Sequence, residues 1–405
     1  MFSLCLFGRP GRFRLSATMN AFIDLEDNDQ VLELVKYTAA LLDAEGESFD
    51  ATCSGLVQEG KVAEVLEQLI KKSNAYYGGE KDVESIFNMI SRLLFTQKSV
   101  GGLVKDLSAA LSAEGVSGHE IVRMKALGNL FNNLPRESPS RFDAYINLLS
   151  LAGRAGRISA VTGQFDQIEG WISEWQISKE QVRALYRKIH SVLFAAGKGR
   201  QSSIYLVKLL ETYNGEPPAT LESAKPDARQ LVAQSLKDPE TYTMEGPTAL
   251  HAMSVLGEAD PERTLLNAFN EGSLDAFQAW QAANPSTLAS LGIEEADLTR
   301  KVRLRNLQFL CAEQQVVDYA TIASKLNIPE SDVEIWIIDV IRAGLVEAKI
   351  DQCNAKVYVN RASHATFDMG SWTDLKSQLT TWQRNIHQVQ RVFGQVQAKI
   401  LEAGR

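Results

Sequence analysis

Residues 318–360 read DYATIASKLNIPESDVEIWIIDVIRAGLVEAKIDQCNAKVYVN, and this stretch decides the fold of the C-terminal half. Its apolar spacing predicts a short helix that ends at Ile328-Pro329, because proline cannot continue a helix and restricts the residue before it. Ser331 and Glu334 have the spacing of a capping box, which predicts the start of a second helix. Apolar residues lie on nearly all sides of that helix, so we expect it to be buried.

After the second helix, apolar and polar residues alternate in the way that is typical of strands. The alternation predicts two strands, Val346–Asp351 and Lys356–Asn360, joined by a polar turn. Two helices followed by a hairpin make a winged helix, and we place its boundaries at about residues 298–360.

A winged helix can bind nucleic acid through its second helix, so the charge of that helix bears on function. Its polar positions carry a net negative charge and are Asp332, Glu334, Asp339 and Arg342. Carboxylates repel the phosphates of a duplex, so we interpret the module as one that binds protein. The predicted contact is an exposed strand edge, with unpaired backbone groups for a partner strand, formed by Lys356, Tyr358 and Asn360.

The composition is that of an ordinary globular protein, with 405 residues of which 45% are hydrophobic and 23% charged. A formal net charge of −8 at pH 7 gives no general attraction to nucleic acid or to an anionic membrane. The 4 cysteines are scattered singly, which favours reduced thiols in a cytoplasmic chain over a disulfide framework or a zinc site. No apolar run approaches the roughly 20 residues that span a membrane, so we expect no membrane partner.

Residues 1–18 differ from the rest, since they contain Arg9, Arg12 and Arg14 and no acidic residue. This composition is similar to a weak mitochondrial presequence. It does not match a secretory signal, because the short apolar run precedes the arginines instead of following them. We interpret residues 1–20 as a disordered extension; translation from Met19 is the other simple explanation.

Residues 21–204 contain one amphipathic helical segment after another, with glycine and proline between them. Serial helices with short turns predict an antiparallel α-solenoid, although no fixed period identifies a repeat type. The predicted fold class is therefore mainly α: a solenoid of helical repeats, a winged-helix module and a long C-terminal helix. The clearest apolar stripes of the solenoid lie at residues 62–70, 83–94, 142–149, 165–175 and 182–193.

A long helix is predicted at residues 371–403, where apolar residues recur at alternating intervals of three and four positions. A terminal helix cannot bury such a seam on itself, so it either folds back on its own solenoid or joins helices of other chains. The strictness of the repeat favours other chains. The seam that we expect to enter a helical bundle consists of Trp372, Leu375, Leu379, Trp382, Ile386, Val389, Phe393, Val396 and Ile400.

No catalytic or cofactor-binding motif is apparent in the sequence. His119-Glu120 lacks the second histidine of a zinc-protease helix, and Lys198 in the GKGR segment is followed by glycine where a phosphate loop needs serine or threonine. Nucleophile-elbow and dinucleotide-binding spacings are also missing. We therefore predict a chain that is not an enzyme and has no cofactor, no metal and no small-molecule substrate.

A basic segment between Lys179 and Lys208 contains only one acidic residue, Glu180. Two interpretations stay open: a solvated helix face, or a face that touches RNA phosphates. The candidates for RNA contact are Arg183, Arg187, Lys188, Lys198 and Arg200.

A helical solenoid, a winged helix and a terminal heptad helix, in this order, resemble PCI-domain proteins, which build the scaffolds of the proteasome lid, the COP9 signalosome and eukaryotic translation initiation factor 3. Within this group the chain is similar to the family of M subunits of the initiation factor, from Met19 or Asn20 onward. The first 18 residues depart from the start of that family. The similarity is carried by AFIDLEDNDQ (21–30), WISEW (171–175), SLKDPETY (235–242), KVRLRNLQFLCAE (301–313), SDVEIWIIDVIRAGLVEAKIDQCNAKVYV (331–359) and SHATFDMGSWTDL (363–375).

The resemblance implies a non-catalytic, cytoplasmic scaffold subunit. It implies a PCI domain at residues 205–363, whose wing pairs with neighbouring wings, and a terminal helix in a bundle shared with other PCI and MPN subunits. The complex of this family binds the small ribosomal subunit and supports recruitment of mRNA and initiator tRNA. Two alternatives stay open: a PCI subunit of the signalosome or the proteasome lid, and a PCI-type RNA adaptor.

Overall fold

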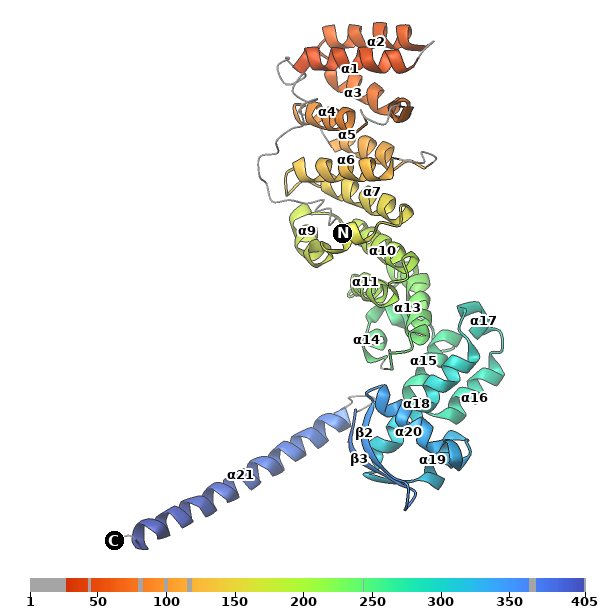
Figure 1. Cartoon of the computed structure of the whole chain (residues 1–405), viewed down its shortest axis with the longest axis vertical. Coiled ribbons are helices and arrows are strands. Elements are labelled where there is room, and N and C mark those ends of the chain that lie inside the picture. The colour runs from red at the N-terminus through yellow and green to blue at the C-terminus, as the bar shows by residue number, and fades with distance from the viewer. Residues whose placement is uncertain are drawn as a thin grey trace. The chain divides into compact units, whose positions relative to one another are not determined.

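The computed structural model describes residues 27–42, 45–78, 83–97, 101–114, 119–242, 244–363 and 369–403 (Figure 1). The extension expected at residues 1–20 lies outside these described residues. The chain forms two compact units, Met1–Thr212 and Tyr213–Arg405. The described residues are mostly helical with one small sheet, so the mainly α fold class is confirmed (Figure 1).

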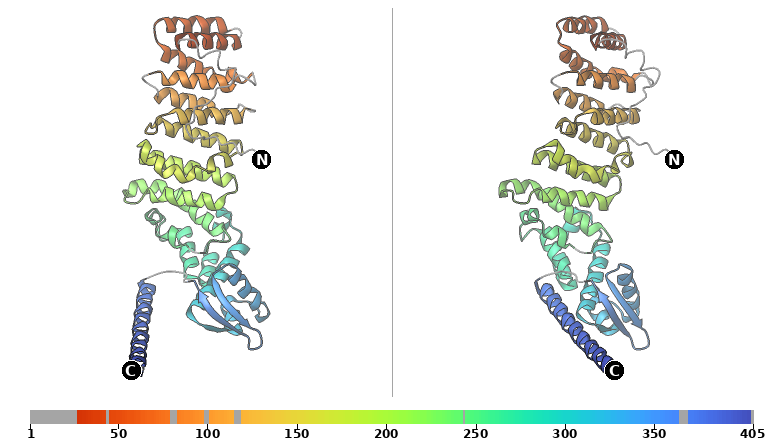
Figure 2. Two further views of the ribbon diagram at one scale, coloured as in Figure 1. Left: turned by 60° about the vertical axis from the view of Figure 1, so that its left-hand side comes forward. Right: turned by 90° about the vertical axis from the view of Figure 1, so that its left-hand side faces the viewer.

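The first unit is a stack of helices that follow one another in chain order (Figure 2). The apolar stripe of each predicted segment faces its neighbours; in α3, for example, Val65, Leu66 and Leu69 are fully buried. Short turns join antiparallel helices, which makes this unit the predicted solenoid. Its helices are α1 (Asp27–Leu41), α2 (Gly46–Gln58), α3 (Val62–Lys71), η3 (Ser73–Gly78), α4 (Val83–Phe95), α5 (Gly101–Leu111), α6 (Glu120–Asn133), α7 (Ser140–Arg154), α8 (Ser159–Thr162), η4 (Phe165–Gln167), α9 (Ile168–Trp175), α10 (Lys179–Ala195) and α11 (Gly199–Glu211).

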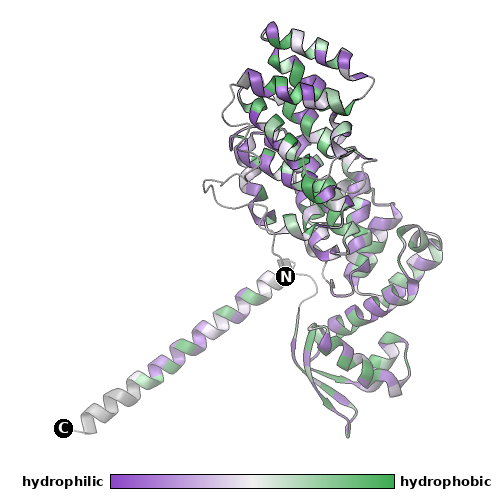
Figure 3. Cartoon of the chain, turned by 45° about the horizontal axis from the view of Figure 1, so that its top comes forward, coloured by the Kyte–Doolittle hydropathy of each residue, from purple (hydrophilic) through white to green (hydrophobic). Residues whose placement is uncertain are grey.

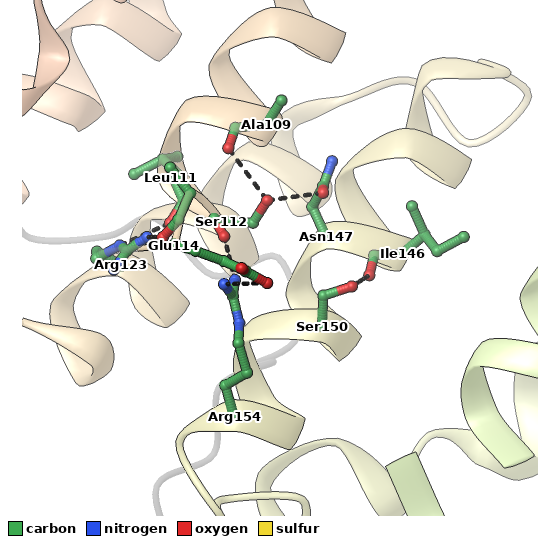
Figure 4. Close-up of polar contacts among 10 residues, drawn as sticks. Ala109, Leu111, Ser112, Glu114, Arg123, Ile146, Asn147, Ser150 and Arg154 are labelled. Carbon is green, nitrogen blue, oxygen red and sulfur yellow. Dashed lines mark hydrogen bonds and ion pairs between the residues drawn. The ribbon is translucent and has the colours of Figure 1, made fainter. Parts of the chain in front are cut away.

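Polar side chains of α6 and α7 close the C-terminal end of α5 (Figure 4). The guanidinium of Arg123, on α6, donates to the carbonyl oxygens of Leu111 and Ala113, each at 2.6 Å. Asn147, on α7, accepts from the hydroxyl of Ser112 at 2.8 Å. The last carbonyls of a helix lack donors within it, so these contacts both cap α5 and fix its packing against α6 and α7.

The second unit begins with further helices and ends with the winged helix and α21 (Figure 1). Before the winged helix come α12 (Pro218–Leu221), η5 (Glu222–Ala224), α13 (Lys225–Lys237), α14 (Glu245–Thr248), η6 (His251–Val255), α15 (Pro261–Glu271), α16 (Leu274–Ala283) and α17 (Thr287–Leu291). The winged helix and the terminal helix comprise α18 (Glu295–Glu313), β1 (Val316–Asp318), α19 (Tyr319–Leu326), η7 (Glu330–Asp332), α20 (Val333–Arg342), β2 (Val346–Asp351), β3 (Lys356–Ala362) and α21 (Met369–Ala403).

The winged helix has its two expected helices and two expected strands, together with a third strand that the sequence analysis missed. The three strands are antiparallel in the order β1-β3-β2. Val317 of β1 lies opposite Val357 of β3, and Ile350 of β2 lies opposite Val357 from the other side. Val357 is fully buried and packs with apolar residues of α18, α19 and α20, so the sheet closes a small core under the helices.

The second helix of the winged helix, α20, differs from its prediction in two respects. The expected capping box is wrong: the hydroxyl of Ser331 bonds the carboxylate of Asp332 at 3.1 Å, and α20 has no side-chain cap. Its expected burial on all sides is also wrong, since Ile335 is 61% exposed and Ile338 is 42% exposed. Only one face of α20 packs on the core, so the residues of the other face remain at the surface.

Candidate functional site

The predicted wing edge is wrong in its position, because β3 is the central strand of the sheet. Residues 356–358 pair with β1 on one side and with β2 on the other. Beyond β1, the amide of Val359 donates to the carbonyl oxygen of Gln315 at 2.8 Å. Tyr358 and Asn360 are exposed and Lys356 is half-buried, but the backbone of residues 356–358 is not available for another strand.

The sheet has two edge strands, β1 and β2, and the longer edge, of 6 residues against 3, belongs to β2. This strand pairs with β3 on one side and has no strand on its other side among the described residues. Its pairing is regular from Ala348 to Asp351 and shifts between Glu347 and Ala348. Glu347 and Lys349 are exposed. Charged residues on an edge strand discourage indiscriminate pairing with other strands.

The tip of the wing is held in place by side-chain contacts. The backbone amide and the side-chain amide of Asn354 donate to the carboxylate of Asp351 at 3.1 and 2.9 Å. These bonds lower the pKa of Asp351 from its ordinary value, the side-chain bond having the largest effect. The side-chain amide of Gln352 donates to Glu334 of α20 at 2.7 Å, and the hydroxyl of Tyr319 donates to the same carboxylate at 3.2 Å. The hairpin is therefore tied to both helices and is presented as a rigid element.

The apolar seam of α21 is at the surface of the protein. The helix has 35 residues, and Figure 3 shows hydrophobic residues distributed along it. The seam side chains that the structure describes are between 37% and 70% exposed: Trp372, Leu375, Leu379, Trp382, Ile386, Val389 and Phe393. The side chains of Val396 and Ile400 lie outside the described set.

The chain leaves the winged helix toward α21 at a fixed point. Gln308 of α18, fully buried, donates to the carbonyl oxygen and to the hydroxyl of Ser363, each at 2.7 Å. The amide and hydroxyl of Ser363 in turn donate to the carbonyl oxygen of Leu345 at 2.9 and 3.0 Å. Sequence reasoning missed this clamp, since neither residue belongs to a motif.

The basic segment divides between buried and exposed positions. Arg183 is only 7% exposed, and its guanidinium donates to the hydroxyl and carbonyl oxygens of Thr212, each at 3.1 Å. This arginine therefore holds α10 against the end of α11. Arg187 and Arg200 are exposed, whereas Lys188 and Lys198 are half-buried.

Three potentially reactive side chains, Ser202, His190 and Cys311, are buried and serve packing. The hydroxyl of Ser202 lies 2.7 Å from Nδ1 of His190, but both residues are buried between α10 and α11, out of reach of a substrate. Burial raises the pKa of the Cys311 thiol to about 11, which suppresses its reactive thiolate. The described residues contain no cluster of histidine, cysteine and carboxylates that could hold a metal ion. No helix in the described part of the chain has the length and apolar character to cross a membrane.

Comparisons with known proteins agree with this architecture. Residues 282–361 match the PCI domain, a range that runs from the end of α16 through almost all of β3. The chain is 29% identical to eukaryotic translation initiation factor 3 subunit M of Gallus gallus, over 91% of this chain and 96% of the relative. It is 28% identical to the Homo sapiens subunit M with the same coverage, and 27% identical to that of Dictyostelium discoideum over 93% and 96%. The chain is thus similar over nearly its whole length to subunit M of eukaryotic translation initiation factor 3, and its residues 282–361 match the PCI domain.

Proposed function

We propose that this chain is a non-catalytic scaffold subunit of eukaryotic translation initiation factor 3, which supports recruitment of mRNA and initiator tRNA to the small ribosomal subunit. The similarity to subunit M over nearly the whole chain supports this assignment, since a subunit works within a multisubunit complex. Other PCI and MPN subunits are the proposed neighbours, the small ribosomal subunit is reached through the complex, and the cytoplasm is the proposed location.

The exposed seam of α21 is the observation that carries the proposal. Complete burial of one large apolar side chain contributes roughly 1.5–3 kcal/mol. The seam offers several such side chains in heptad spacing on one helix, so a bundle of partner helices would gain on the order of 10 kcal/mol from it before association costs. A helix with this unused apolar surface is suited to assembly with other helices.

The test replaces Leu379, Trp382 and Ile386 together by glutamine in the tagged chain. We expect the variant to lose the other subunits of the initiation factor on co-purification, while its thermal unfolding stays unchanged because all three side chains are at least half exposed. The matched control replaces Thr381, Arg384 and Gln388, on the opposite face of α21, by alanine. Normal co-purification of the seam variant with the initiation factor subunits refutes the proposal. If signalosome or proteasome-lid subunits co-purify with the unmodified chain, the alternative of a PCI subunit in one of those complexes is favoured.

The wing is the second proposed contact, and the edge that we propose is β2 instead of β3. A strand from a neighbouring PCI subunit would extend the sheet in the order β1-β3-β2-partner. Hydrogen exchange on the chain alone and in its complex tests this arrangement. We expect the amides of residues 348–351 that point away from β3, which are every other one, to gain protection on assembly, while those of β3, already paired on both sides, do not. Equal exchange of β2 in both states contradicts it.

A direct RNA contact through the basic segment is the second candidate function. The observation that favours it is the exposure of Arg187 and Arg200 on neighbouring helices, with Lys188 and Lys198 half-buried beside them. Binding of single-stranded RNA by the isolated chain at low salt, lost on Lys188→Glu with Lys198→Glu, supports this function. Absence of binding at low salt eliminates it, because phosphate contacts are strongest there.

A further inference from the structure

A groove lies between α18 and α20 in the second unit, and no residue of the β2 edge or of the α21 seam lines it. Its volume is about 680 Å³. One wall comes from the first turns of α18, and the other from α20 and the residue before it. Its lining includes Glu295, Arg300, Arg303, Asp332, Ile335 and Trp336. A volume of this size accommodates several side chains of a bound peptide.

The two walls of the groove are held together by contacts between α18 and α20. The guanidinium of Arg300 donates to the carboxylate of Asp339 at 2.7 Å. The guanidinium of Arg303 lies over the indole ring of Trp336, 5.6 Å from the centroid. A cation over an aromatic face is attracted by the ring quadrupole. The groove is therefore preformed, and a ligand would not need to order its walls.

The apolar part of the groove is exposed although the fold does not require it to be. Ile335 lines the groove and is 61% exposed, and Ile338 lies one turn further along the same face of α20. Val333, Ile337 and Val340 on the opposite face suffice to bury α20 against the core. Large apolar side chains that do not contribute to the core, set beside a groove, mark an interaction surface.

The charge of the groove indicates the chemistry of its partner. Arg300 is paired with Asp339, whereas Arg303, stacked on Trp336, keeps its positive charge. The three carboxylates and two arginines of the lining leave a net charge of −1. Glu295 and Asp332 form no ion pair in the part of the chain that the structure describes. A lining with a net negative charge, beside exposed apolar side chains, favours cationic groups over phosphates.

We propose that the α18–α20 groove binds a segment of a partner polypeptide in which basic residues flank large apolar ones. The apolar side chains would cover Ile335 and Ile338, and lysine or arginine would pair with Glu295 and Asp332. This contact is independent of the strand edge of β2 and of the seam of α21, and a failure at either of those surfaces leaves it intact.

A random peptide library displayed on phage and selected on the full-length chain tests the proposal. We expect enrichment of peptides that combine leucine, isoleucine or phenylalanine with lysine or arginine. Ile335→Asp should weaken an enriched peptide at least about tenfold, which corresponds to losing the burial of one isoleucine. The matched control is Ile204→Asp, another exposed isoleucine, located on α11.

A charge reversal separates the proposed chemistry from simple hydrophobic adhesion. Glu295→Lys together with Asp332→Lys should lose the basic peptides and select acidic ones. Glu295 is exposed and Asp332 is half-buried, so thermal unfolding of the variant is measured alongside to show that it is folded. The proposal is overturned if no enriched peptide depends on Ile335, or if the reversed variant selects the same sequences. Binding of single-stranded RNA that Ile335→Asp abolishes also overturns it, since that result makes the groove a nucleic-acid site.

Discussion

Replacing Lys301 by methionine should destabilise the second unit by about 3 kcal/mol at neutral pH. The ammonium group of Lys301, on α18, is buried and donates to three carbonyl oxygens at the end of α13: Ser235 at 2.8 Å, Leu236 at 3.2 Å and Asp238 at 2.7 Å. A buried carbonyl left without a donor costs roughly 1–3 kcal/mol, so the loss of three donors costs on the order of 6 kcal/mol.

A second effect opposes the loss of these hydrogen bonds. Burial lowers the pKa of Lys301 from 10.5 to about 8. Such a shift means that burying the charge costs about 3 kcal/mol, which methionine recovers, and the difference of the two effects gives the expected net loss. The measurement is urea unfolding of both proteins. The control is Lys325→Met, which makes the same change at an exposed position of α19.

The pH dependence of the stability difference between the unmodified chain and Lys301→Met gives a sharper test of the environment of Lys301. Because the folded-state pKa lies below the unfolded one, the unfolded chain binds more protons above about pH 8, so stability rises with pH. The unmodified chain should gain about 1.3 kcal/mol over Lys301→Met between about pH 7 and about pH 9. A difference that stays constant or shrinks over this interval refutes the assigned environment of the ammonium group, and equal stability at neutral pH refutes its role as a cap.

Two further changes test the packing that positions the winged helix. Gly272→Ala should lower the free energy of unfolding by at least about 2 kcal/mol, because Gly272 has φ +63° and a Cβ there would overlap the ring of Phe309. The control Gly215→Ala, with φ +78° and open space around the Cβ, should lower it by only about 1 kcal/mol. Equal shifts in the thermal midpoint of the two variants would contradict the overlap. Gln308→Leu should lower the free energy of unfolding by about 1–3 kcal/mol and speed hydrogen exchange of the Ser363 amide. The control Gln314→Leu, at an exposed position, should do neither. Unchanged exchange in the Gln308 variant would show that Gln308 does not hold the chain at Ser363.

Local periodicity was enough to predict the elements of the winged helix. The helical spacing before Pro329 and the alternation after Gly344 each depend on neighbours in sequence, and both appear in the structure as α19 and the β2–β3 hairpin. The strand β1 could not be found in this way, because three residues are too few for an alternating pattern. It exists through pairing with β3, about 40 residues later. Which strands lie at the edges of the sheet therefore depends on contacts between residues far apart in sequence.

The candidate site shows the same division between local and tertiary information. The heptad spacing identified the seam of α21 correctly as a continuous helical stripe, and its exposure needed the structure. Charge counting grouped Arg183 with the surface cations, although its hydrogen bonds with Thr212 make it part of the packing of α10 and α11. Apolar residues lie on nearly every side of α20, so the sequence pattern could not identify which face is exposed. The exposed face contains Ile335.

The central position of β3 also has a consequence for synthesis of the chain. The strands β1 and β2 do not pair with each other, and each of them depends on β3, the last strand to be made. A nascent chain that ends before Lys356 holds both outer strands with every backbone group of the ladder unpaired. The winged helix can therefore mature only after β3 has been synthesised, and a product truncated before β3 exposes two strands that are prone to aggregate.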